Sequence, residues 1–187
     1  MESLEQPFPA KFICGVIFSE GVDLELVHQK CESLWGNIQD QSQTHNFSLG
    51  SSYYSQQMGA VHHRYFVSFV GLVDPVVLAE RKRQAIELEA WASKAFPLCA
   101  RPLNLDPGLL MRGRMVLATT KDFSHRVYLS QGIYAEVTLQ FKKKTIVPLP
   151  WTYPDILQGH YNEFLWRVKE LFLLETKANA AILPKPS

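Results

Sequence analysis

The sequence has little excess charge of either sign and few cysteines. Nineteen basic side chains stand against eighteen acidic ones in 187 residues, so the formal net charge is +1. Because proteins that bind nucleic acids usually carry a marked basic excess, this balance argues against a nucleic-acid partner and leaves room for a local basic site only. The three cysteines, Cys14, Cys31 and Cys99, form no CxxC pair, which argues against a disulfide framework and a zinc site. We expect all three cysteines to be reduced and to serve mostly as packing residues.

Several motifs that would identify a function are also missing. The chain contains neither GxxxxGK followed by Ser or Thr nor GxGxxG, the phosphate-binding motifs of the commonest nucleotide-binding folds, and it lacks the zinc motif HExxH. It has no basic N-terminal region followed by an apolar run, and no stretch near the roughly 18 apolar residues that span a membrane. We therefore expect a cytoplasmic protein without a membrane contact. The sequence identifies neither a metal nor a cofactor.

The first third of the chain predicts a strand followed by a helix. Residues 11–19 are β-rich and apolar on both alternating faces, as in a strand near the middle of a sheet. Gly21 and Asp23 then open a helix, and Gly36 is typical of its C-terminal end. The apolar stripe of this helix is Leu24, Val27, Cys31 and Leu34. The polar, aperiodic residues 37–59 predict a long irregular excursion.

The middle of the chain repeats this order. Residues 64–73 predict a strand, and Asp74-Pro75 starts a helix, with Asp as the N-cap and Pro in the first turn. The buried stripe of this helix is Leu78, Ala85, Leu88 and Ala92. The same capping logic at Asp106-Pro107 predicts a short helix over residues 109–118, although the β-branched end of that segment would also suit a strand.

The last third predicts two β-hairpins and a helix. The first hairpin pairs residues 125–129 with 133–141 through a three-residue turn at 130–132, and a lysine-rich tip then leads to a strand near 145–149. Apolar residues at helical spacing from Tyr161 to Phe172 predict a C-terminal helix. These elements predict an α+β fold with one mainly antiparallel sheet and helices packed on one face of it, with an elaborated ferredoxin-like core as one option. We expect one domain over residues 1–187, with loose tails at 1–10 and 178–187.

The first hairpin places a charged pair on one face. If Gly132 ends a three-residue turn, Tyr128 faces Tyr134 and Arg126 faces Glu136 on one side. A guanidinium fork oriented by a carboxylate can hold a phosphate or a carboxylate ligand. The alternative is a surface salt bridge between neighbouring strands, worth less than about 1 kcal/mol.

His125 lies beside Lys121, Asp122 and Arg126 in the same segment. A histidine whose pKa is near 6.5 can act as a general base. In the predicted register, however, His125 is on the apolar side, where a partly buried histidine bonded to a backbone carbonyl is the alternative. We take His125, Glu136 and Asp122 as candidate catalytic residues, and a metal site that adds Asp106 to these three remains an alternative.

The segment PLPWTYPD, residues 148–155, is rigidified by three prolines and shows Trp151, Tyr153 and Asp155. It can form the wall of a pocket. A packed connection between the last strand and the last helix is an equal alternative.

Four blocks of the sequence are similar to a known family. NLDPG from Asn104, LATTKDFSHRVYL from Leu117, GIYAEVTL from Gly132 and PLPWTYPD from Pro148 resemble an uncharacterised prokaryotic family, the domain of unknown function 4416. The upstream SSYYSQQMG and SFVGLVDPVVLAE fit as well, so the resemblance covers nearly the whole chain. The family has no established activity, and the GTP-binding label of some members gains no support from a sequence without a P-loop. The polar positions in these blocks are Asn104, Asp106, Lys121, Asp122, His125, Arg126, Tyr128, Tyr134, Glu136, Trp151, Tyr153 and Asp155.

Two hypotheses follow. The first is a small bacterial enzyme or sensor for an anionic, phosphorylated or nucleotide-like ligand, which Arg126 and Lys121 bind while His125 or Glu136 transfers a proton. The second is a non-catalytic interaction module, in which the segment around Tyr53-Tyr54 and the Trp151 segment meet a protein or RNA partner. A closed pocket in which Arg126, Glu136, Asn104 and Asp106 converge would favour the first, and a flat aromatic surface the second.

Overall fold

The computed structural model describes residues 7–47, 58 and 62–179 of the chain. These residues form one nine-stranded sheet in the order β2-β4-β1-β5-β6-β8-β7, with β3 paired to β4 and β9 paired to β8. Every pairing in it is antiparallel. The strands are β1 (Ala10–Ser19), β2 (Ile38–Gln41), β3 (His45–Asn46), β4 (His62–Val73), β5 (Leu103–Leu110), β6 (Arg114–Thr119), β7 (Val127–Ser130), β8 (Ile133–Lys142) and β9 (Thr145–Pro148). The helices are α1 (Leu24–Trp35), the 3-10 turn η1 (Pro75–Val77), α3 (Leu78–Ala95), α4 (Pro154–Leu157) and α5 (Asn162–Ala178).

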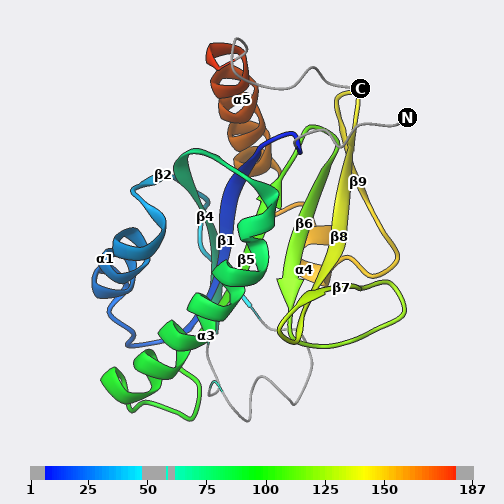
Figure 1. Ribbon diagram of the computed structural model, residues 1–187. Coiled ribbons are helices and arrows are strands. Elements are labelled where there is room, and N and C mark those ends of the chain that lie inside the picture. The colour runs from blue at the N-terminus through cyan, green and yellow to red at the C-terminus, as the bar shows by residue number, and fades with distance from the viewer. Residues whose placement is uncertain (1–6, 48–57, 59–61, 180–187) are drawn as a thin grey trace.

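The α+β class and the mainly antiparallel sheet are confirmed, but the prediction that the helices lie on one face is wrong. Strand β1 is buried along its whole length and sends alternate residues into two separate cores. Phe12 packs with residues of α1 and α3, whereas Ile13 packs with residues of α5. In Figure 1, α3 crosses in front of the sheet and α4 lies behind β6 and β8. Helices therefore cover both faces.

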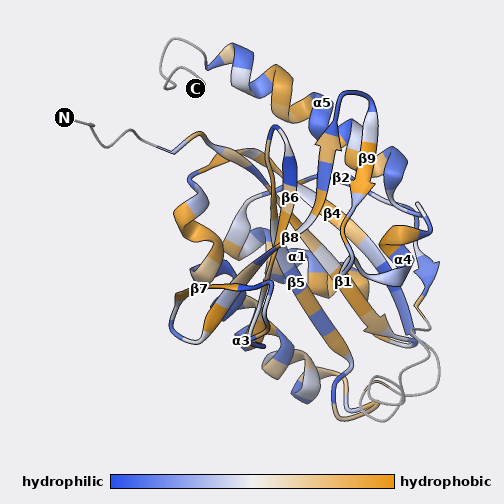
Figure 2. Cartoon of the chain, turned by 90° about the vertical axis from the view of Figure 1, so that its right-hand side faces the viewer, coloured by the Kyte–Doolittle hydropathy of each residue, from blue (hydrophilic) through white to orange (hydrophobic). Residues whose placement is uncertain are grey.

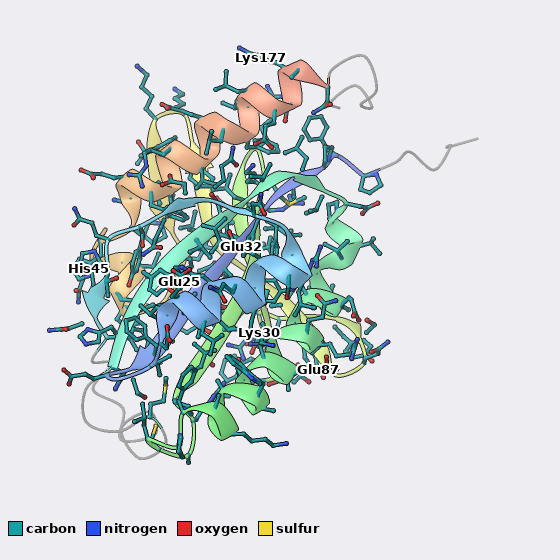
Figure 3. The ribbon with its side chains drawn as sticks, turned by 90° about the vertical axis from the view of Figure 1, so that its left-hand side faces the viewer. Glu25, Lys30, Glu32, His45, Glu87 and Lys177 are labelled. Carbon is teal, nitrogen blue, oxygen red and sulfur yellow. The ribbon has the colours of Figure 1, made fainter. Side chains whose placement is uncertain are left out.

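The two predicted helix starts are confirmed. The Asp23 side chain accepts a hydrogen bond from the Leu26 N–H at 3.1 Å, and the Asp74 side chain accepts one from the Val76 N–H at 2.8 Å. The stripe of α1 differs by one residue from the prediction, because Trp35 is buried while Leu34 is 42% exposed. Figure 3 shows charged side chains on the outer side of α1, Glu25, Lys30 and Glu32 among them.

Hydrophobic and hydrophilic residues lie side by side along the C-terminal helix α5 in Figure 2. Its apolar side buries Phe164, Leu165, Val168 and Phe172 against the sheet, as the spacing predicts. None of the helices in the described part of the chain is both long and apolar enough to cross a membrane.

The helix predicted over residues 109–118 is wrong, because this segment forms the end of β5 and most of β6. Leu105 and Met111 direct their N–H groups away from β1, toward Glu89 and β6 respectively. Pro107 is separated from Leu105 and Met111 by an even number of residues, so its backbone nitrogen also points away from β1. Because proline has no N–H group, no hydrogen bond to β1 is lost. Position 108 requires glycine, because β5 and β6 come so close there that a Cβ atom would lie 2.6 Å from the Val116 carbonyl oxygen. Strand pairing on both sides thus overrides the helix-start signal.

The hairpin turn is also shorter than predicted. Ser130 pairs with Ile133, so the turn is Gln131-Gly132, and both of its residues have positive φ, as in a type I′ turn. A bulge at Leu129 then restores the predicted partners, because Tyr128 pairs with Tyr134.

Within the excursion predicted over 37–59, the described residues 37–47 are more regular than predicted, since β2 and β3 both pair with β4. Tyr53-Tyr54 lies outside the described residues. A ferredoxin-like core is not confirmed. Helix α1 connects β1 to β2, and β4 lies between these two strands, antiparallel to both. The single-domain prediction stays a prediction.

Candidate functional site

The site begins where β5 and β6 separate. The two strands pair only from Gly108 to Leu110. Before that point α3 replaces β6: the Leu105 N–H donates to the Glu89 carboxylate at 2.8 Å, and the Leu105 carbonyl oxygen accepts from the Lys82 ammonium at 2.6 Å. Two charged side chains therefore satisfy the open edge of β5, and β6 continues alongside β8 alone.

A cavity of about 280 Å³ occupies this gap. Six of the residues proposed from the sequence line it: Asn104, Asp106, Lys121, Arg126, Glu136 and Tyr153. The other lining residues are Lys82, Arg101, Leu117, Ala118, Thr119 and Thr120. The lining contains four basic and two acidic side chains, so its charge favours an anion.

Glu136 is the most enclosed acid of the cavity, with 2% of its surface exposed. Its Oε2 accepts hydrogen bonds from Arg126 Nε at 2.7 Å and from His125 Nε2 at 3.2 Å. Its Oε1 has no hydrogen-bond partner among the described residues. One carboxylate oxygen is thus fixed by two donors, while the other keeps unused acceptor capacity.

The predicted pair of Arg126 and Glu136 is therefore present, but the placement of His125 on the opposite, apolar side is wrong. Strand β7 begins only at Val127, and the chain turns just before it, with the Arg126 N–H bonded to the Phe123 carbonyl oxygen at 2.9 Å. This turn brings the His125 ring to Glu136 and stacks it on Trp151, with ring centroids 4.6 Å apart. Arg126 also donates to the Lys121 carbonyl oxygen at 3.0 Å and so fixes the loop that carries Lys121.

Asn104 lies on the opposite wall and is 3% exposed. Its Oδ1 accepts a hydrogen bond from Arg101, which also pairs with Glu89 at 2.9 Å. Its Nδ2 has no hydrogen-bond partner among the described residues. Asn104 thus presents donors to the cavity.

A fully buried arginine lies next to the cavity. Arg64 on β4 bonds both oxygens of Asp155 through Nη1, at 3.0 and 3.3 Å, and reaches Asp106 Oδ2 through Nη2 at 3.3 Å. Burial alone would lower the pKa of the Arg64 guanidinium, but the two carboxylates hold that pKa above its ordinary value. Gly15 lies on β1, between β4 and β5, and leaves room for the Arg64 side chain to cross β1 toward Asp106. A Cβ atom at position 15 would lie 3.1 Å from Arg64 Nη2.

The comparisons with known proteins give one match. The model of the family described as Domain of unknown function (DUF4416) matches residues 8–172. The chain belongs to this family. No curated protein and no solved structure matches the chain.

Residues 8–172, matched by DUF4416, include every described residue that lines the cavity, from Lys82 on α3 to Tyr153 before α4. The remaining candidates lie around the cavity rather than in it. Tyr128 and Tyr134 contact each other edge to face on the outer hairpin, at 5.3 Å between ring centroids. Trp151 donates to the Val137 carbonyl oxygen at 2.8 Å, and Asp155 is the partner of Arg64. Asp122 is exposed and does not line the cavity.

Three basic residues of this DUF4416 site were missed from the sequence: Arg64, Lys82 and Arg101. The signal for Lys82 was available, because it stands four residues after Leu78 and three before Ala85, on the buried stripe of α3. A lysine on such a stripe needs a buried partner. Arg64 occupies an inward position of β4 in the same way, two residues before Phe66.

Neither buried cysteine is placed as a nucleophile. Burial raises the pKa of the Cys31 thiol to about 12 and that of the Cys14 thiol well above its ordinary value, so both stay protonated. Among the described residues, no group of three or more His, Cys, Asp or Glu side chains is arranged to hold a metal ion.

Proposed function

We propose that the protein is a small cytoplasmic enzyme or sensor that binds an anionic ligand, phosphorylated or nucleotide-like, in the cavity between β5 and β6. One observation carries the proposal: Arg126, Glu136, Asn104 and Asp106 converge on one cavity whose basic side chains outnumber its acidic ones by four to two. The three free cysteines, which suit a reducing compartment, support the cytoplasmic location.

Arg126 is the principal anion-binding group in this proposal. Its Nε and Nη1 are used by Glu136 and by the Lys121 carbonyl oxygen, which orient the guanidinium. Its Nη2 has no hydrogen bond to a described residue and is available to a phosphate or carboxylate oxygen. Lys82 adds a second positive charge to the lining. Its ammonium forms ion pairs with Asp106 and Glu89 at 3.8 Å, which are longer than hydrogen bonds and offset that charge in part.

Glu136 is the group best placed for proton transfer if the ligand reacts. Its Oε1 is buried and unpaired in the described part of the chain, while Arg126 and His125 hold Oε2 in place. His125 is the alternative, because Glu136 and the Trp151 ring orient its imidazole. Asp122 has no such support.

The test is calorimetric titration with inorganic phosphate, small phosphate esters and nucleotides. Replacing Arg126→Ala should weaken binding about tenfold or more, because a charge-assisted bond to the anion is lost. The unfolding temperature should fall by only a few degrees, since Glu136 keeps His125 as a partner. A large fall in that temperature with unchanged affinity would mark Arg126 as structural. Arg167→Ala is the matched control, because it removes an equal charge from an exposed pair with Asp40, away from the cavity.

A second candidate, a non-catalytic interaction module, is supported by the outer edge of the sheet. Every residue of β7 is exposed, and large apolar side chains gather there: Phe123 at 63%, Val127 at 68%, Tyr128 at 57% and Trp151 at 38% exposure. A protein partner that bound this edge should be lost on replacing Val127→Lys together with Tyr128→Ser, as measured by co-purification. Anion binding in the cavity should survive that change.

A further inference from the structure

Two buried side-chain atoms in the cavity wall have no hydrogen-bond partner among the described residues. They are Asn104 Nδ2 and Glu136 Oε1, on residues that are 3% and 2% exposed. A buried polar group without a partner costs free energy, and such groups are rare in folded proteins unless a ligand or solvent completes them. Both residues line the same 280 Å³ cavity.

The hydrogen bonds made by the rest of each side chain determine whether the remaining atom is a donor or an acceptor. Asn104 must turn its oxygen toward Arg101, because a guanidinium can only donate, so its NH₂ group is the part that remains. Glu136 uses Oε2 to accept from Arg126 and His125, so Oε1 remains as an acceptor. A ligand that satisfies both must therefore accept from Asn104 and donate to Glu136.

A hydroxyl group meets both requirements, because it donates one hydrogen bond and accepts two. Thr119 and Thr120 extend the polar wall. Among the described residues of the lining, Tyr153 is the only aromatic one, and its ring lies 5.4 Å from the Arg64 guanidinium carbon. The lining has hydroxyls, charges and an amide, with Leu117 and Ala118 as its aliphatic residues, so it offers one ring and not two for stacking on a nucleobase. The volume also lies at the small end of ligand pockets, which run from about 300 to 1,000 Å³.

We infer that the ligand is a small polyol that carries a phosphate or a carboxylate, such as a sugar phosphate or a sugar acid. The anionic group binds Arg126 and the other cations, and a hydroxyl group bridges Asn104 Nδ2 and Glu136 Oε1. This inference rests on the proposed anion site and narrows its ligand from phosphorylated compounds in general to hydroxylated ones.

The experiment compares ligands of equal charge with and without hydroxyl groups. The titration pairs glycerol 3-phosphate with propyl phosphate, and glycerate with propanoate, so that the two pairs distinguish a phosphate from a carboxylate. In at least one pair the hydroxylated ligand should bind about tenfold more tightly or better, because its analogue leaves both buried atoms unpaired. Ribose 5-phosphate should also bind at least as tightly as a nucleoside monophosphate.

Two nearly isosteric variants assign the preference to the named atoms. Asn104→Asp keeps an acceptor for Arg101 but replaces the NH₂ group by oxygen, and Glu136→Gln keeps an acceptor for Arg126 but turns an NH₂ group to the cavity. Each variant also changes the charge of the site, but this affects both ligands of a pair equally, so the affinity ratio isolates the hydroxyl contact. In Asn104→Asp the ratio should fall from about ten or more toward one, because the ligand hydroxyl then has one hydrogen for two acceptors. In Glu136→Gln the ratio should fall less, because the hydroxyl can accept from both NH₂ groups. The unfolding temperature of each variant is recorded to confirm folding.

The outcomes separate the inference from the function on which it rests. If the anions bind but neither glycerol 3-phosphate nor glycerate binds more tightly than its analogue without hydroxyl groups, anion binding stands and the polyol inference is overturned. A nucleoside monophosphate that binds tenfold more tightly than ribose 5-phosphate would also overturn it. If none of these anions binds, the proposed function itself fails.

Discussion

Two arginine–carboxylate sites lie near each other in this molecule and differ in what surrounds them. Arg64 has no exposed surface and joins β4, β5 and α4 through Asp106 and Asp155. Arg126 keeps 13% of its side chain exposed and pairs with Glu136 at the cavity wall. The first arginine is enclosed by protein, and the second lines a cavity. Burial of the arginine itself, rather than of its carboxylate partner or the kind of ion pair, thus distinguishes the Arg64 pair from the pair proposed to bind a ligand.

The aromatic surroundings strengthen this contrast. The Arg64 guanidinium carbon lies 4.8 Å from the Phe66 ring centroid, 5.3 Å from that of Phe47 and 5.4 Å from that of Tyr153. Rings at these distances stabilise a desolvated cation. Asp106 belongs to both sites, since it pairs with Arg64 and lines the cavity. The ion pairs of Arg64 therefore hold one wall of the cavity in place.

Removal of the buried arginine should have the largest effect. Replacing Arg64→Met leaves Asp155 without its bidentate partner in a buried position, so the free energy of unfolding should fall by about 3–5 kcal/mol. Denaturation by urea measures this loss. Arg126→Met is the comparison and should cost less, about 1–2 kcal/mol, because the buried Glu136 carboxylate keeps its hydrogen bond from His125. Equal losses for the two variants would remove the distinction between the sites.

Lys82 should show both kinds of effect, because it caps the Leu105 carbonyl oxygen and also lines the cavity. Lys82→Met keeps the length of the stem but leaves that carbonyl unsatisfied, at a cost of about 1–3 kcal/mol in the free energy of unfolding. Affinity for a phosphate ester should fall as well, since a positive charge is removed from the lining. A variant that changed stability alone would place Lys82 with Arg64 as a structural cation.

The Arg126 pair could be predicted from the sequence and the Arg64 pair could not, because their partners differ in how far apart they lie in the sequence. The partners Arg126 and Glu136 lie on neighbouring strands of one hairpin, so turn geometry and strand alternation place them together. The two-residue turn and the bulge at Leu129 were not predicted, yet their offsets cancel and leave Tyr128 opposite Tyr134. His125 was predicted on the wrong side of the hairpin because β7 begins only at Val127, so strand alternation does not apply to His125.

The Arg64 site depends on contacts that the local pattern does not contain. Arg64 and Asp155 are 91 residues apart, and the crossing between them requires Gly15 on a third element, β1. The Asp-Pro-Gly sequence at 106–108 was wrongly predicted to start a helix for the same reason. The role of each of its residues is set by β1, β6 and α3, which are distant in sequence.

A smaller effect tests how closely Arg64 is packed. Replacing Gly15→Ala places a Cβ atom 3.0 Å from Phe66 Cε1 and 3.1 Å from Arg64 Nη2, so the ion pairs must shift. We expect a loss of about 1–2 kcal/mol in the free energy of unfolding. Gly113→Ala is the matched control, because no atom lies within 4 Å of its new Cβ, and it should change stability by less than about 0.5 kcal/mol. If the two alanine variants behaved alike, the crossing over β1 would be looser than the distances indicate.

The smallest effect concerns pH and should distinguish the buried site again. Burial, with a further contribution from Asp155, raises the pKa of the Tyr161 hydroxyl above its ordinary value, although Arg64 opposes this. An unfolded tyrosine ionises near pH 10. Above that pH the unfolded chain therefore releases a proton that the folded chain keeps, and stability falls as pH rises.

At pH 11 this contribution is about 1 kcal/mol, and Tyr161→Phe should remove it, so that the free energy of unfolding declines less between pH 9 and pH 11 than in the unchanged protein. Tyr65, whose pKa burial also raises, accounts for part of the decline that remains. Tyr134→Phe, at a partly exposed tyrosine on the hairpin of Arg126, is the control for the loss of a tyrosine hydroxyl. Identical pH profiles for all three proteins would show that the surroundings of Arg64 are open to solvent in solution, and the contrast between the two arginines would then lose its basis.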